Sequence, residues 1–143
     1  MKDRILSLFC ALVIIMGLPA TACASEVTPR ASDYFSCTGV CAVAVGGGKV
    51  LIEIDVDATH KMEEVGASVV HIYEEQSDGS FRKVFTYTKE AYPSLIEEDS
   101  YFGYVDVTYQ GTSGKDYYAI VACYAKDSVG SEMLYFYTNV VTA

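Results

Sequence analysis

The feature that most limits how this chain can fold is a strict alternation of apolar and polar residues. It is clearest at residues 50–57, where acidic residues such as Glu53 and Asp55 stand between the apolar ones, namely Val50, Ile52, Ile54 and Val56. Successive side chains of a β-strand point to opposite faces of the sheet, so a period of two puts all four apolar residues on one face. The segment therefore predicts a strand with one buried and one solvated face.

Similar alternation predicts six more strands, and turn-forming residues separate them. These strands are expected at 37–45, around Val70 and Ile72, and at 81–88, 103–109, 117–125 and 133–141. Clusters of glycine, aspartate and serine predict turns at 46–48, 76–80, 111–114 and 127–130. Seven short strands with a turn about every 8–12 residues are typical of an all-β, antiparallel β-sandwich.

Two segments interrupt this rhythm. Residues 58–66 lose the alternation and end on Gly66, which favours one helical turn closed by the glycine. Residues 89–100 contain Pro93 and three consecutive acidic residues, and they predict the longest loop.

The first 24 residues carry the three parts of a secretory signal peptide. Lys2 and Arg4 precede an apolar stretch at 5–18, and small residues surround Cys23. This stretch of 14 residues is shorter than the roughly 20 that a membrane-spanning helix needs. We therefore predict cleavage after residue 24 and a secreted or extracellular protein with no membrane span. Lipidation of Cys23 is the alternative, and it would give a cell-surface lipoprotein.

The remaining chain is expected to form one acidic domain. Residues 25–35 are predicted to form a short linker, and residues 36–143 are predicted to form the β-sandwich domain. The whole chain has 10 basic and 19 acidic residues, and removing Lys2, Asp3 and Arg4 leaves 8 and 18. Such a surface repels nucleic acid, so no nucleic-acid partner is expected.

The sixth predicted strand resembles the start of the last hairpin of a fibronectin type III or immunoglobulin-like domain. Tyr117 begins it, and small or apolar residues follow at every second position, namely Ala119, Val121, Cys123 and Ala125. In that family the tyrosine anchors a loop, which is the role the resemblance implies for Tyr117. The tryptophan common in the family is absent here.

A second resemblance concerns the lead-in Pro-Arg-Ala-Ser-Asp-Tyr-Phe at 29–35 and Glu-Val-Gly-Ala-Ser at 64–68. Both are similar to segments of an uncharacterised family of small secreted proteins of Gram-positive anaerobic bacteria. This resemblance implies location and fold, and it implies nothing about activity.

No residue pattern predicts catalysis, a cofactor or a metal. The two histidines are His60 and His71, and His71 lies within a predicted strand. No Gly-x-Ser-x-Gly motif occurs. The acidic residues do not form an Asp-x-Asp-x-Asp-Gly loop, so we interpret them as a solvated face rather than a calcium site. No catalytic, cofactor-binding or metal-binding residue is therefore predicted.

Three cysteines of the predicted domain leave the disulfide pairing open. Cys37 and Cys41 share a strand face, and Cys123 is expected to point into the core. Cys37–Cys41, a bridge from the first strand to Cys123, and no bridge at all are the three alternatives.

Tyrosine is the one residue type that points towards a function. Besides Tyr117, seven of the 12 tyrosines lie on or directly before the last three predicted strands, namely Tyr101, Tyr104, Tyr109, Tyr118, Tyr124, Tyr135 and Tyr137. Tyrosine suits a half-exposed strand in any case, but several on one sheet face would form a platform for a protein or glycan partner. The sequence therefore predicts a non-enzymatic binding or surface-interaction module. The alternative is a secreted hydrolase or hydrolase inhibitor that uses His71 or His60.

Overall fold

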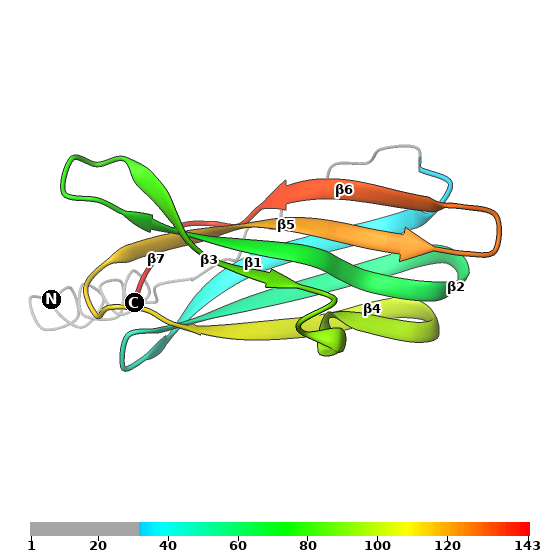
Figure 1. Cartoon of the computed structure of the whole chain (residues 1–143), viewed down its shortest axis with the longest axis horizontal. Helices are drawn as coiled ribbons and strands as arrows, with labels where there is room; N and C mark the ends of the chain where they lie inside the picture. The colour runs from blue at the N-terminus through cyan, green and yellow to red at the C-terminus, as the bar shows by residue number, and fades with distance from the viewer. Residues whose placement is uncertain (1–31) are drawn as a thin grey trace, which may run out of the picture.

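The computed structural model describes residues 32–143, and seven β-strands with one short 3-10 helix make up this part of the chain (Figure 1). The elements are β1 (Phe35–Gly46), β2 (Lys49–Glu75), β3 (Phe81–Thr88), η1 (Pro93–Leu95), β4 (Ile96–Gln110), β5 (Asp116–Lys126), β6 (Ser131–Tyr137) and β7 (Val141–Thr142). All paired strands run antiparallel. The prediction of an all-β antiparallel fold is therefore confirmed. The predicted signal peptide, with Cys23, and most of the predicted linker lie outside the described residues.

The 27-residue strand β2 is the central strand of the sheet, and four other strands pair with it. Its first half pairs with β1 and its second half with β5, while β4 and then β3 pair along its other side. β5 continues the sheet to β6 and β7. β2 turns back on itself at the end of the molecule away from its two hairpins, and β4 turns with it (Figure 1). This bend makes the sheet curl.

The helical turn predicted at 58–66 is wrong, because these residues lie within β2. At the bend the register of β2 against β4 jumps from Asp57–Phe102 to Met62–Ser100, so residues 58–61 face a single residue of β4. The extra residues break the alternation without ending the strand. The second and third predicted strands are thus one strand.

Two glycines allow the backbones to approach closely at this bend. A Cβ on Gly66, whose φ is +146°, would lie 2.2 Å from the carbonyl oxygen of Leu95. A Cβ on Gly103 of β4 would lie 2.7 Å from the carbonyl oxygen of Val65. Only a residue without a side chain fits at either position.

One hydrophobic core fills the curl. The inward residues predicted for the second strand, Val50, Ile52, Ile54 and Val56, are fully buried, as are Tyr117, Ala119, Val121, Cys123 and Ala125 of β5.

The side-chain amide of Asn139, which follows β6, connects this part of the chain to β1. Its Nδ2 donates to the carbonyl of Ala42, and its Oδ1 accepts from the Ala42 N–H, both at 2.9 Å.

The remaining predictions hold in part. β3 has the predicted bounds, and the turn at 76–80 is present, with Gly79 at φ +80°. The predicted long loop is shorter, because β4 begins at Ile96 and includes the acidic residues at 97–99. The last predicted strand is two, since β6 ends at Tyr137 and β7 begins at Val141.

Among residues 32–143 there is no helix with the length and apolar character needed to cross a membrane.

Candidate functional site: an aromatic sheet face

The second half of β2 and strands β3, β5 and β6 carry aromatic side chains on their outer side. We call this surface the aromatic face and define it by Tyr73, Phe81, Tyr118, Met133, Tyr135 and Tyr137. Tyr117 and Ala119 of β5 point into the core, so Tyr118 between them points outward. Tyr118 pairs with Tyr73 of β2, and Ile120 pairs with Tyr137 of β6. The strand register thus brings the three tyrosines next to one another.

The rings of this face contact one another in a row. The rings of Tyr73 and Tyr118 stack at 4.9 Å with an angle of 5° between their planes. Phe81 meets Tyr118 edge-on at 4.9 Å, and Tyr137 stacks on Tyr118 at 6.4 Å. Aromatic pairs of this kind contribute about 0.5–1.5 kcal/mol each beyond their buried area. The row is therefore held in place before any partner binds.

The outer end of the row is open to solvent. Tyr135 is 62% exposed and Tyr137 68%. Met133, which is also exposed, lies on the same strand two residues before Tyr135. An exposed group of large apolar side chains on a sheet is unusual for a surface that only meets water.

His71 lies beside the aromatic face and favours its neutral form. His71 of β2 pairs with Ile120 of β5, and its Nδ1 lies 2.9 Å from the hydroxyl of Thr86. Burial, followed by the nearby charge of Lys83, lowers the pKa of His71 and so favours its neutral form. Within residues 32–143, His71 forms a hydrogen bond with neither a serine nor an aspartate.

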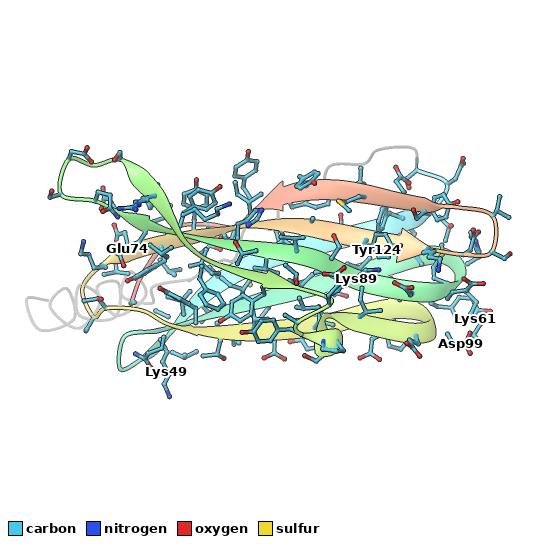
Figure 2. The ribbon with its side chains drawn as sticks, in the orientation of Figure 1. Lys49, Lys61, Glu74, Lys89, Asp99 and Tyr124 are labelled. Carbon is cyan, nitrogen blue, oxygen red and sulfur yellow. The ribbon has the colours of Figure 1, made fainter. Side chains whose placement is uncertain are left out.

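Charged side chains border this surface on two sides. Lys83 of β3 pairs with Tyr73, and an ion network lies at the far end. Lys89 lies over the ring of Tyr124, with Nζ 4.2 Å from its centroid, and donates to Glu64 at 2.6 Å (Figure 2). The hydrogen bond from Lys89 lowers the pKa of Glu64. Lys126 also reaches Glu64, at 3.5 Å. The charged groups at this end therefore pair with one another, and the aromatic face ends where they begin.

The other outer surface, over β1, the first half of β2 and β4, has the opposite character. Glu53 and Asp55 of β2 lie beside Asp106 and Tyr104 of β4. A shallow hollow of about 260 Å³ opens here above Gly39. Tyr104 donates to Glu53 at 3.3 Å, and the charge of Glu53 raises the pKa of Tyr104. This acidic face is the solvated side that the alternation of β2 predicts.

The structure divides the seven predicted tyrosines into three groups. Tyr118, Tyr124, Tyr135 and Tyr137 share the outer side of β5 and β6, as the platform hypothesis requires. Tyr101 and Tyr104 are exposed on β4 instead. Tyr109 turns inward and packs on Tyr117 at 5.7 Å.

Tyr73 and Phe81 were missed as members of the aromatic face. They come from β2 and β3, whereas the tyrosine count drew attention to the last three strands. The signal that finds Tyr73 is the pairing of the third and sixth predicted strands, because this register sets Tyr73 opposite Tyr118.

His60, the other candidate of the hydrolase hypothesis, connects the bend of β2 with the turn that follows β5. Its Nε2 lies 2.9 Å from Asp127, and its Nδ1 lies 3.0 Å from the hydroxyl of Thr59. The Thr59 hydroxyl donates its proton to the carbonyl of Asp33, so it can only accept from His60. The geometry therefore does not activate Thr59 as a nucleophile, since a base would have to take that proton.

The cysteines lie on different sides of the sheet. Cys123 is a fully buried free thiol, and burial raises its pKa to about 12. Cys37 is an exposed free thiol, and the Cys41 thiol donates to Glu53 at 3.3 Å. The proposed bridge from the first strand to Cys123 is wrong, because the inward residues of β1 are Val40 and Ala42. The Cys37–Cys41 bridge is absent as well.

Within residues 32–143, no group of three or more histidine, cysteine and acidic side chains is arranged to hold a metal ion.

No protein-family model matches the chain, and no curated protein matches it either.

Proposed function

We infer that the curled sheet is a β-sandwich of the fibronectin type III kind. Its two layers would be β1, the first half of β2 and β4, and then β3, the second half of β2, β5 and β6. Both the pairing of the strands and the single core between them support this arrangement.

Tyr117 supports the same inference. It stands at the start of β5, and its hydroxyl accepts from the N–H of Thr112, five residues upstream, at 2.9 Å. A tyrosine that anchors the preceding corner in this way is a hallmark of such sandwiches.

We propose that the protein is an exported, non-enzymatic binding module that recognises a protein partner through the aromatic face. The observation that carries this proposal is the row of tyrosines across β2, β5 and β6, which ends in two exposed rings. The centres of protein–protein interfaces are rich in tyrosine, phenylalanine and methionine and poor in charge. The aromatic face has this composition on a chain with a net charge of −9.

A protein partner fits the ring geometry better than a glycan does. The rings of Tyr73 and Tyr118 stack face to face, so these faces are not available for a sugar ring. Their edges, the exposed rings of Tyr135 and Tyr137 and the side chain of Met133 remain for contact. Aromatic and aliphatic side chains of a partner protein would pack against this uneven surface.

The experiment is a binding screen of the protein against a panel of extracellular proteins and a glycan array. Tyr135→Ser/Tyr137→Ser is the test variant, and Tyr101→Ser/Tyr104→Ser is the matched control, because these rings are 60% and 57% exposed on β4. We expect protein ligands that the control retains and the test variant loses. Binding to glycans alone, or equal binding by both variants, would contradict the proposal.

The exported state has its own test. Mass spectrometry of the secreted species should find an N-terminus at residue 23, 24 or 25 of the printed sequence. A lipid on Cys23 would place the module at the membrane surface, and an intact Met1 would refute export.

A further inference from the structure

Strand β6 ends the sheet on the side away from β2. The order of the strands is β1-β2-β5-β6, and among residues 32–143 no strand pairs with β6 besides β5. Figure 1 shows β6 along the upper margin of the molecule. One row of its backbone N–H and C=O groups therefore lacks a strand partner.

The register of β5 and β6 identifies these groups. The N–H of Asp127 donates to Gly130, and the N–H of Thr138 donates to Ala119, at the two ends of the pair. Pairing between these ends has no shift, so hydrogen-bonded positions alternate regularly along β6. The residues bonded to β5 are 132, 134 and 136. The outward backbone groups belong to Ser131, Met133, Tyr135 and Tyr137.

This edge lacks the features that keep exposed strands apart. Its four outward residues carry neither a charge nor a proline. The charged side chain of β6, Glu132, points to the other side and accepts a hydrogen bond from Ser32. The edge strand β3 differs, because Arg82 and Lys83 interrupt it and its register shifts at Tyr73.

We propose that β6 pairs with β6 of a second copy of this chain, antiparallel and with Leu134 on the two-fold axis. In this register all seven residues of β6 are paired. Met133 of each copy falls opposite Tyr135 of the other, and Ser131 falls opposite Tyr137. A thioether against a ring edge and a small residue against a large one are favourable neighbours. The edge is thus complementary to itself, as a two-fold interface must be.

The charge distribution of the chain is compatible with a second copy at this edge. Two molecules of net charge −9 repel each other, and the acidic residues Glu53, Asp55 and Asp106 lie on the other surface. Pairing along β6 keeps these acidic faces away from the contact. The dimer joins the two aromatic faces into one surface and does not depend on their binding a partner.

The test is sedimentation equilibrium of the full chain over a concentration series. We expect a dimer for the wild type and for Met133→Leu. Met133→Pro removes an outward N–H and leaves the β5–β6 bonds intact, so it should shift the equilibrium to the monomer while the circular dichroism spectrum is unchanged. A wild type that stays monomeric throughout, or a folded Met133→Pro that dimerises like the wild type, would overturn the proposal.

Hydrogen exchange gives a second readout if Met133→Pro fails to fold. In the wild type, the amides of Met133 and Tyr135 should become protected as the concentration rises, whereas those of Lys83 and Val84 on β3 should not change. Concentration-independent exchange at Met133 and Tyr135 would exclude β6 as the interface.

Discussion

At the scale of single residues, Tyr117 connects the core with a loop. Its ring is fully buried, and its hydroxyl donates to Glu74 at 2.6 Å while accepting from Thr112 at 2.9 Å. Desolvation, followed by the bond to Glu74, raises the pKa of Tyr117. The expectation from sequence that this tyrosine points inward is confirmed. Its bond to Glu74 was not predictable, because Glu74 lies on another strand.

Tyr117→Phe should lower the free energy of unfolding by about 1–3 kcal/mol, since it leaves the Thr112 N–H without its acceptor and Glu74 without its donor. Tyr117→Ala should cost more, on the order of 3–5 kcal/mol, because it also removes the ring from the core. Urea denaturation measures both values. An unchanged midpoint for Tyr117→Ala would show that the ring is not a core residue.

The His60–Asp127 pair predicts a pH dependence. Its hydrogen bond and the backbone N–H groups of Gly130 and Val129 lower the pKa of Asp127 to about 2. A carboxyl with a lowered folded pKa stabilises the fold above its unfolded pKa, and this stabilisation fades as the pH falls from about 4 towards 2. His60→Ala should raise the Asp127 pKa, as measured by NMR titration of the carboxyl carbon. His71→Ala is the control, and an equal change of this pKa in both variants would show that His60 does not hold the Asp127 carboxylate.

The cysteines should differ in reactivity. Cys37 is exposed, whereas Cys123 is buried and its pKa is raised to about 12. Since the thiolate is the reactive form, an alkylating reagent should modify Cys37 in the folded protein and Cys123 only after unfolding. Peptide mapping by mass spectrometry identifies the modified residues. Labelling of Cys123 at the rate of Cys37, or a disulfide involving either one, would be inconsistent with the structure.

At the scale of elements, the bend in β2 and β4 decides how the sheet curls. It depends on Gly66. The φ angle of this residue is positive, and the carbonyl of Leu95 occupies the position that a side chain at residue 66 would take. Gly66→Ala should therefore destabilise the fold by about 2 kcal/mol or more. Gly39→Ala is the matched control, because its Cβ would meet nothing nearer than 4.0 Å. Thermal unfolding compares them, and equal melting temperatures would refute the role of Gly66.

The same bend marks the limit of what the sequence predicts about the elements. Alternation alone identified the inward residues of β5 and of the first half of β2, because burial on one face imposes a period of two. It failed at 58–61, where the strand continues without regular pairing. It also placed Glu97 and Glu98 in a loop, since consecutive acidic residues rarely favour a strand. Their strand conformation follows from pairing with Val65 and Glu64 of β2.

At the scale of the whole molecule, the fold presents two outer surfaces of opposite character. One carries Glu53, Asp55 and Asp106, and the other carries the aromatic face. The abundance of tyrosine pointed to such a platform, but its composition depends on which strands are neighbours. Tyr109 left the set by turning inward, and Tyr73 joined it through its register with Tyr118. Chain-distant pairing of this kind is not encoded in local alternation.

The affinity of the protein for a ligand found in the screen decides whether the aromatic face is the binding surface. Isothermal titration calorimetry would compare the wild type, Tyr135→Ser/Tyr137→Ser and Tyr101→Ser/Tyr104→Ser. Loss of two aromatic anchors at an interface should weaken binding by roughly 100-fold or more, while the control should stay within about threefold of the wild type. A control variant that loses as much affinity as the test variant, or a test variant that loses none, would show that the aromatic face is not the binding surface.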